Sequence, residues 1–218
     1  FKKYFKEYNF HKLYKELLNF CSLDLSAFYF DIRKDTLYCD EIKSPKRQVS
    51  INFLDLVLNM LLKWFAPILS FTTEEIYQIL HKEKNTSIHL QSFPKIPTEW
   101  ENNKLFDKWN KLKIVRSVVN SAIEVKRANK DIGSSLEADI EIYLGEEYLK
   151  LIKDINLSEY FITSRANAKP YIENSKIFKM QDTAEIGVLV TKAKGEKCSR
   201  CWKILKSPCE RMNCGLKN

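Results

Sequence analysis

Apolar residues return at helical spacing through most of the first 130 positions of the chain. Asn9 is expected to cap one helix near the amino terminus, and Ser22 is expected to cap the next. A long helix is predicted over residues 46–65, ending before Pro67 because proline lacks the amide hydrogen that a helix needs. The sequence TTEE at residues 72–75 has the pattern of a capping box, which predicts that a further helix begins there.

Another strong helix is predicted over residues 104–129, after a proline-containing loop. Its apolar stripe consists of Leu112, Val115, Val118, Val119, Ala122 and Ile123. Lys126 and Arg127 lie in its last turn, where cations interact favourably with the helix dipole and would also suit a phosphate group. The spacing leaves both interpretations open, a solvated helix end and a contact with nucleic acid.

The apolar period changes from helical to alternating after residue 133. Residues 136–144 and 186–190 alternate apolar and polar positions, as half-buried strands do. A short helix is predicted over residues 146–155, and a further strand over residues 160–162. We therefore predict a mainly α protein in three parts, namely a helical bundle over residues 1–133, a small mixed α/β unit over residues 134–192 and a cysteine-containing tail over residues 193–218.

The composition is that of a soluble, folded chain, since 44% of the 218 residues are hydrophobic and 29% are charged. The longest apolar stretch, residues 53–71, contains Asp55 and Lys63, so we expect no membrane span. The chain begins at Phe1 within a predicted helix and without a secretory leader, from which we expect a cytoplasmic fragment. The net charge is +8, and residues 192–218 hold +6 of it, which indicates a polyanionic partner for the tail.

Two cysteine pairs near the carboxy terminus give the strongest chemical signal. Two residues separate Cys198 from Cys201, four separate Cys209 from Cys214, and seven lie between the pairs. This arrangement can bring four thiolates to one tetrahedral ion, for which zinc is favoured. Four ligands leave no position for an activated water, so we expect one structural zinc and no catalysis by it.

The alternatives to a metal are two disulfides or four unrelated thiols, which the lack of a secretory leader disfavours. Cys21 and Cys39 stand singly among apolar helical positions, and we interpret them as buried small hydrophobic residues, not as ligands. None of the three histidines has a catalytic partner at motif spacing, and five glycines leave no phosphate-binding loop. No catalytic residue is therefore predicted.

Cations and one aromatic residue surround the cysteine pairs, an arrangement suited to an RNA backbone or an unstacked base. Trp202 could instead only cover the sulfur ligands, and its position in the sequence does not decide between the two roles. The predicted nucleic-acid contacts are Arg116, Lys126, Arg127, Arg200, Trp202, Lys203 and Arg211.

Several longer strings resemble one known family. YNFHKLY at residues 8–14, NFCSLDLS at residues 19–26 and FYFDIRKDTLY at residues 28–38 resemble the opening of the anticodon-binding helical domain of bacterial-type isoleucyl-tRNA synthetases. LKWFAPILSFTTEEI at residues 62–76 is similar to a signature shared by the isoleucyl, valyl and leucyl enzymes. VRSVVNSAIE at residues 115–124 and IGSSLEA at residues 132–138 favour the isoleucyl branch, and the terminal Cys-x2-Cys-Trp resembles its zinc finger.

The resemblance implies the carboxy-terminal part of a class I synthetase that activates isoleucine with ATP and charges tRNA(Ile). Its catalytic domain, which would bind ATP and Mg²⁺, and its editing domain would lie upstream in the same monomeric polypeptide. Neither adenylate-forming motif, HIGH or KMSKS, occurs in these 218 residues, so we expect tRNA and zinc binding without aminoacylation by this chain alone. The family usually has a longer segment between its cysteine pairs and Cys-x2-Cys at the second, so the loop between the pairs is expected to differ here. A stand-alone nucleic-acid-binding zinc protein is the alternative, which the helix strings disfavour.

Overall fold

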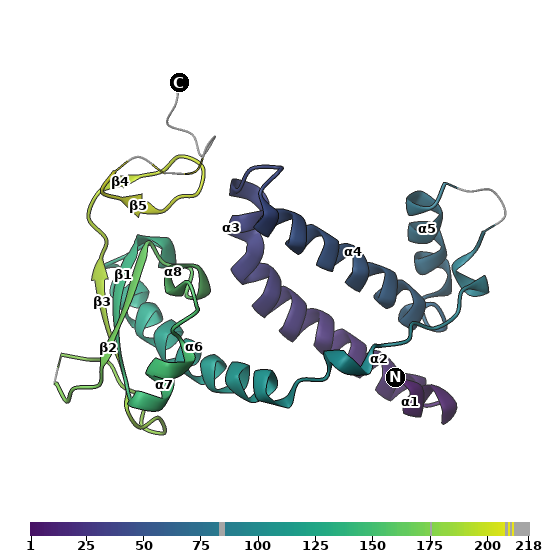
Figure 1. Cartoon of the computed structure of the whole chain (residues 1–218), viewed down its shortest axis with the longest axis horizontal. Coiled ribbons are helices and arrows are strands. Elements are labelled where there is room, and N and C mark those ends of the chain that lie inside the picture. The colour runs from purple at the N-terminus through teal and green to yellow at the C-terminus, as the bar shows by residue number, and fades with distance from the viewer. Residues whose placement is uncertain (83–85, 175, 208, 210, 212–218) are drawn as a thin grey trace. The chain divides into compact units, whose positions relative to one another are not determined.

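The computed structural model describes residues 1–82, 86–174, 176–207, 209 and 211. The chain forms two compact units, one from Phe1–Leu37 with Ile42–Trp100 and the other from Tyr38–Glu41 with Glu101–Asn218. The first unit is helical, and the second combines helices with two small sheets (Figure 1). The prediction of a mainly α chain with a small mixed unit is therefore confirmed, whereas the division into three domains at residues 133 and 192 stays a prediction.

The first unit begins with a nearly continuous helical stretch. Its elements are α1 (Lys2–Lys6), α2 (Phe10–Asn19), a π-helical segment (Phe20–Phe30) and α3 (Asp31–Cys39). Asn9 caps α2 as predicted, because its side chain accepts a hydrogen bond from the Lys12 amide at 3.3 Å. The prediction that Ser22 caps a new helix is wrong. The backbone is helical at both ends of the π-helical segment, at Phe20 and at Asp31, so no helix begins at Ser22. The wider turn continues the helix where the sequence suggested a break.

The next helices are α4 (Pro45–Phe65) and α5 (Ser70–Leu80), followed by 3₁₀ turns at Ile88–Leu90 and Thr98–Trp100. Pro45 occupies the first turn of α4, where its missing amide hydrogen costs nothing, and the predicted long helix is confirmed. The predicted capping box at residues 72–75 does not form, because α5 begins earlier, at Ser70. The Thr73 hydroxyl instead donates a hydrogen bond to the Leu69 carbonyl at 3.0 Å. Buried side chains of α4, α5 and the first 3₁₀ turn form a core cluster of Leu62, Ala66, Tyr77 and Ile88.

The Glu74 carboxylate fastens α5 to the 3₁₀ turn at Ile88–Leu90. It accepts hydrogen bonds from the Gln78 side-chain amide at 2.7 Å, the Ser87 hydroxyl at 2.8 Å and the Ile88 backbone amide at 2.9 Å. These donors, Gln78 foremost, hold the pKa of Glu74 below its ordinary value because they favour the charged form. The carboxylate thus satisfies the backbone amide of Ile88, the first residue of the turn.

Replacing Glu74 with glutamine is therefore expected to lower the free energy of unfolding most at neutral pH. A depressed folded-state pKa contributes stability above the unfolded pKa, and that contribution is lost as pH falls through the folded pKa. Urea unfolding of the parent and Glu74→Gln should thus differ at pH 7 and converge on acidification toward pH 3. The exposed neighbour Glu75, changed to Gln, is the matched control and should show no such convergence. A Glu74 difference that grew on acidification would contradict the role assigned to the carboxylate.

The second unit is built on a three-stranded sheet and a long helix. Its elements are α6 (Asn103–Ala128), a 3₁₀ turn (Ser135–Glu137), β1 (Ala138–Leu144), α7 (Glu146–Leu151), α8 (Leu157–Tyr160), β2 (Arg165–Pro170) and β3 (Ile186–Lys192). The strand order is β2-β1-β3, with β2 parallel and β3 antiparallel to the central β1. α6 packs against this sheet (Figure 1). The helix over residues 104–129 and the strands over residues 136–144 and 186–190 are confirmed.

The core of this unit lies between α6 and the sheet. Every residue of the predicted α6 stripe is buried, and Leu112 and Val115 are fully so. On β1, Ile140 and Ile142 have no exposed surface and pair with residues of β3. The apolar face of the helix repeats every 3.6 residues and that of the strand every 2 residues, and the two faces pack in one core. These regular patterns are why both elements could be predicted from the sequence.

Between β1 and β3 one prediction is wrong and one strand was not predicted. Residues 160–162 form no strand; instead Asn156 accepts from the Glu159 amide at 3.2 Å and starts the short helix α8. A run of three apolar residues cannot distinguish a buried helix end from a strand, and burial of Tyr160 and Phe161 satisfies either. The edge strand β2 was missed because Arg165–Pro170 is polar and ends in proline, which only an edge position accommodates.

Candidate metal centre and nucleic-acid interface

The first cysteine pair lies at the turn of a small hairpin. β4 (Glu196–Lys197) pairs antiparallel with β5 (Ile204–Leu205). The turn is closed by the Cys198 amide, which donates to the Lys203 carbonyl, and by the Trp202 amide, which donates to the Cys198 carbonyl, both at 2.9 Å. Gly195 precedes β4 with φ of 136°, and a Cβ there would collide with the Leu205 carbonyl oxygen. The sequence thus fixes a tight loop that presents two thiols on one side.

Three hydrogen bonds attach this hairpin to the sheet of the second unit. The Ser164 hydroxyl accepts from the Ile204 amide at 2.6 Å, and the Arg165 guanidinium donates to the Lys194 carbonyl at 2.6 Å. The Ala193 amide donates to the Glu137 carbonyl at 2.8 Å. The cysteine loop is therefore positioned by the folded sheet.

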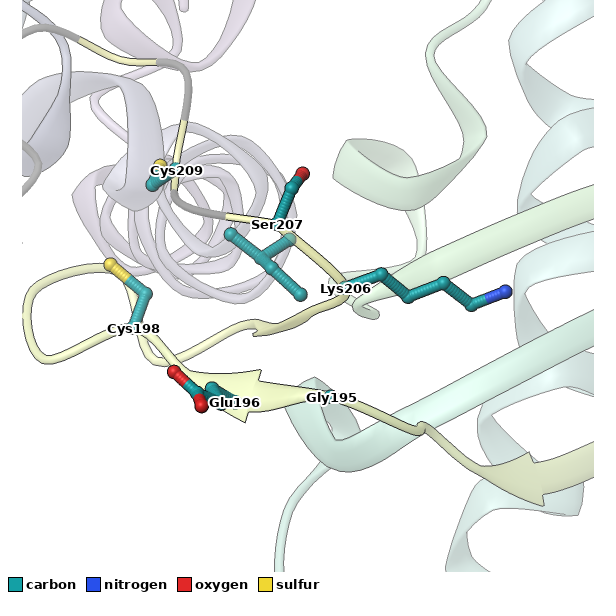
Figure 2. A pocket seen from close by; sticks show the side chains of 7 residues that line it. Gly195, Glu196, Cys198, Lys206, Ser207 and Cys209 are labelled. Atoms are coloured by element: carbon teal, nitrogen blue, oxygen red, sulfur yellow. The ribbon is translucent and has the colours of Figure 1, made fainter.

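Cys198, Cys201 and Cys209 bring their sulfur atoms together. The three Sγ atoms all lie within 4.8 Å of one another. Cys198 is 2% exposed, Cys201 is 6% exposed and Cys209 is half-buried. Figure 2 shows Cys198 after β4 and Cys209 on the segment that follows β5, lining one hollow of about 430 Å³.

The donor set suits a thiophilic ion. Sulfur ligands at the zinc distance of 2.3 Å in a tetrahedron are about 3.8 Å apart, a spacing that the three thiols can reach with small side-chain rotations. No disulfide joins any of the five cysteines in the described part of the chain. This cluster could therefore hold a metal ion. Cys214, the predicted fourth ligand, lies outside the described residues.

The two remaining cysteines differ from each other. Cys39 is 6% exposed, as expected for a buried thiol, but it packs in one cluster with Cys198 and Cys201. Cys21 is only half-buried in the π-helical segment, where partial burial raises the pKa of its thiol. The position of Cys39 beside the three clustered cysteines was not predicted.

The predicted nucleic-acid contacts on α6 have different surroundings. Lys126 pairs with Asp131 at 3.0 Å and Arg127 pairs with Glu124 at 2.7 Å, and these side chains near the helix end are about half exposed to solvent. Arg116 is only 7% exposed and lies 5.4 Å over the ring of Tyr160, whose pKa burial raises to about 12 despite this neighbouring cation. Little of the Arg116 guanidinium is thus open to a phosphate.

The predicted contacts on the tail are also unequal. Trp202 is 60% exposed and has φ of 63°, a left-handed conformation that is unusual for a bulky residue. The Lys197 amino group lies 6.0 Å from the centre of its ring. Lys203 is half-buried, whereas Arg200 and Arg211 both bind residues of the 38–41 segment. Exposure of the indole disfavours the interpretation that Trp202 only covers the sulfur atoms.

Tyr38 and Asp40 are site residues that the sequence analysis missed. The Tyr38 carbonyl accepts from the Arg200 guanidinium at 2.8 Å, and the Asp40 carboxylate pairs with Arg211 at 3.1 Å. The one feature of the sequence that could have indicated them is Cys39, which lies between them and belongs to neither cysteine pair. Its sequence separation from the tail hid the contact.

Comparison with known proteins identifies the family. A family model for the anticodon-binding domain of tRNA ligases matches residues 1–142. The chain belongs to this family. It is 51% identical over 211 residues to isoleucine–tRNA ligase of Pelagibacter ubique, covering 97% of this chain and 22% of that protein. The corresponding ligases of Rhodopseudomonas palustris and Bartonella henselae are 41% and 39% identical over 93% and 91% of the chain.

This anticodon-binding family member spans about a fifth of the length of the curated relatives that it matches. The matched region is the carboxy-terminal part of those relatives, as the sequence resemblance implied. The match to residues 1–142 covers the whole first unit and also α6 and most of β1. Within the described residues, no helix combines the length and apolar composition needed to cross a bilayer.

Proposed function

We propose that this chain is the tRNA-binding carboxy-terminal part of an isoleucine–tRNA ligase. The observation that carries the proposal is the 51% identity to such a ligase over 97% of the chain, together with the anticodon-binding match. The complete enzyme would activate isoleucine with ATP and charge tRNA(Ile), and its ATP and Mg²⁺ would bind in the upstream catalytic domain. We also propose a cytoplasmic, monomeric enzyme. The cited relatives are all ligases, so a stand-alone binding module gains no support.

The metal that we propose for the cysteine cluster is zinc, bound by Cys198, Cys201, Cys209 and Cys214. Support comes from the three converging thiols, whose softness selects zinc over oxygen-preferring ions. Four sulfur ligands would close the coordination shell, so the ion would supply structure to a tail with little apolar surface of its own.

The RNA surface that we propose combines the α6 end with the tail. Lys126 and Arg127 would contact phosphates after exchanging their acidic partners, and Lys203 would contact them beside the hairpin. Arg116, Arg200 and Arg211 would act mainly through packing or through their protein partners. Trp202 would stack on an unpaired base, for which an exposed, strained aromatic side chain beside a cation is suited.

Replacing Trp202 with alanine is expected to weaken tRNA(Ile) binding by about 5- to 150-fold, since one base–aromatic stack contributes roughly 1–3 kcal/mol. Filter binding or fluorescence anisotropy with the transcript would measure the change in dissociation constant. Metal content should stay at the parent value, because the indole is not a ligand. Trp100, 53% exposed in the first unit, provides the matched control Trp100→Ala, which should bind tRNA like the parent.

The same titration at rising salt tests the cationic contacts. Affinity should fall linearly on a logarithmic scale, with a slope of about −0.7 to −0.9 for each phosphate neutralised. Affinity independent of salt would contradict the phosphate contacts, and equal losses in the two Trp variants would contradict the stack. Equal affinity for tRNA(Ile) and a non-cognate tRNA would remove the support for cognate anticodon recognition by this chain.

A further inference from the structure

Three consecutive residues at and after the end of α3 bind the cysteine-containing tail. The Arg200 guanidinium donates to the Tyr38 carbonyl at 2.8 Å. The Cys39 thiol donates to the Arg200 carbonyl at 3.9 Å, so Arg200 is bound at both its side chain and its backbone. The Asp40 carboxylate pairs with the Arg211 guanidinium at 3.1 Å. All five residues belong to the second compact unit.

The contacts are more buried than ordinary surface contacts. Cys39 forms a buried cluster with Cys198 and Cys201, with Leu205 and Cys209 packed against it. The side chains of Asp40 and Arg211 are 14% and 28% exposed, whereas those of Lys126 and Asp131 are 40% and 49% exposed. An ion pair that is partly removed from water is screened less by salt and is held in one geometry.

Arg200 and Arg211 lie next to the cysteines that we propose as metal ligands, so their contacts with residues 38–40 can position these ligands. Arg200 lies between Cys198 and Cys201, and Arg211 lies two residues beyond Cys209. One short segment therefore binds both halves of the thiol cluster. A metal ion that needs its ligands in one place is bound more tightly when the two halves are already held together.

We propose that residues 38–40 form a seat on which both halves of the cysteine cluster assemble, with Asp40 and Arg211 as positioning residues for the metal. This inference rests on the proposed metal site and adds residues to it that ligate nothing. The linkage is reciprocal, since whatever the seat contributes to metal binding, the metal returns by stabilising the seat. Arg200 and Arg211 thereby serve the metal centre first and RNA only through it.

The test is zinc affinity of the 218-residue chain, measured by competition with a chromogenic chelator. Asp40→Asn and Arg211→Gln are each expected to weaken zinc binding about 10-fold or more, the loss typical of groups that orient metal ligands. The double variant should lose little more than either single variant, because both remove the same contact. Asp131→Asn, which breaks the exposed pair with Lys126, is the matched control and should bind zinc like the parent.

The visible absorption of bound cobalt distinguishes positioning from ligation. Asp40→Asn saturated with cobalt should keep the parent's tetrahedral thiolate spectrum, since no ligand is lost. A changed spectrum would make Asp40 part of the coordination shell, and parent-like affinity of both variants would overturn the seat. If Asp40→Asn does not fold by circular dichroism, Arg211→Gln carries the same test from the other side of the contact.

Failure of the metal site and failure of the seat have different signatures. A parent chain without stoichiometric zinc would refute the metal site. The seat is then tested on the chain as purified, where Asp40→Asn should raise the rate at which iodoacetamide alkylates Cys39 severalfold, because loss of the Arg211 contact loosens the tail that buries this thiol. An unchanged rate in folded protein would overturn the seat even where zinc binds.

Discussion

Replacing Cys198 with serine is expected to abolish stoichiometric zinc binding by the chain. Cys198 is 2% exposed, and its sulfur is one of three that lie within 4.8 Å of one another. A serine hydroxyl is a poor ligand for zinc beside thiolates and cannot supply the negative charge that they share. Because structural zinc sites contribute about 10–16 kcal/mol to folding of small metal domains, loss of one ligand removes most of the tail's folding free energy.

Elemental analysis of the purified chain measures this directly. About one zinc per parent chain is expected, and none above background in Cys198→Ser. The matched control is Cys21→Ser, a half-buried cysteine in the π-helical segment of the first unit, which should keep the zinc. Zinc retained in Cys198→Ser, or lost in both variants, would contradict a site built on the hairpin cysteines. Cys214→Ser, in the same series, tests the fourth ligand.

The position of the hairpin explains why this effect should stay local. The side chains of Ser164 and Arg165 bind backbone groups of Ile204 and Lys194, and the sheet that carries them has a core of its own. Circular dichroism of the α6 and sheet region in the absence of denaturant should therefore change little in Cys198→Ser. The proposed metal would order the tail, whereas the apolar core orders the sheet to which the hairpin is attached.

The sequence was informative wherever one local rule decided the structure. α4 begins at Pro45 and α6 carries an unbroken apolar stripe, so their ends were predicted within about a residue. The spacing of the cysteine pairs also predicted that their thiols converge, whereas the ion that they would bind stays a prediction. Three of the four predicted ligands lie in the described residues, and they do meet.

The failures occurred where tertiary contacts override local pattern. The TTEE sequence within α5 does not form a capping box, because Glu74 binds the 3₁₀ turn across a loop and the Thr73 hydroxyl donates back to the Leu69 carbonyl. Residues 160–162 read as a strand by composition but end a helix capped by Asn156. Polarity hid β2, whose role is to cover one edge of β1.

The seat formed by residues 38–40 was beyond any local rule. Cys39 and Arg200 are 161 positions apart, so no spacing pattern could connect them. Arg200 and Arg211, which bind the seat, were predicted as RNA contacts, because sequence does not distinguish a cation that faces RNA from one that binds a group of the protein. Only the fold shows that Asp40 lies beside Arg211.

Replacing Ile142 with alanine is expected to lower the free energy of unfolding by about 2–5 kcal/mol, the usual cost of an Ile→Ala cavity in a core. Ile142 has no exposed surface, lies on the central strand β1, and pairs with Ala168 of β2 and Val188 of β3. The cavity would thus open where all three strands meet. Since single domains are stable by only about 5–15 kcal/mol, this is a large fraction of the total.

Urea unfolding gives the change as a shift in midpoint at constant slope. Ile172, which is 47% exposed, provides the matched control Ile172→Ala, expected to cost well under 1 kcal/mol because little apolar surface is lost. Equal costs at the two positions would contradict the core assigned to the sheet. Because β3 continues through Ala193 and Lys194 into the hairpin, Ile142→Ala should also weaken zinc binding at urea concentrations where the sheet begins to open, although Ile142 touches no ligand. The loss of zinc binding should follow the unfolding of the sheet and should disappear without denaturant. A variant of a cysteine ligand would lose zinc even without denaturant, so the two kinds of variant distinguish support by the fold from ligation.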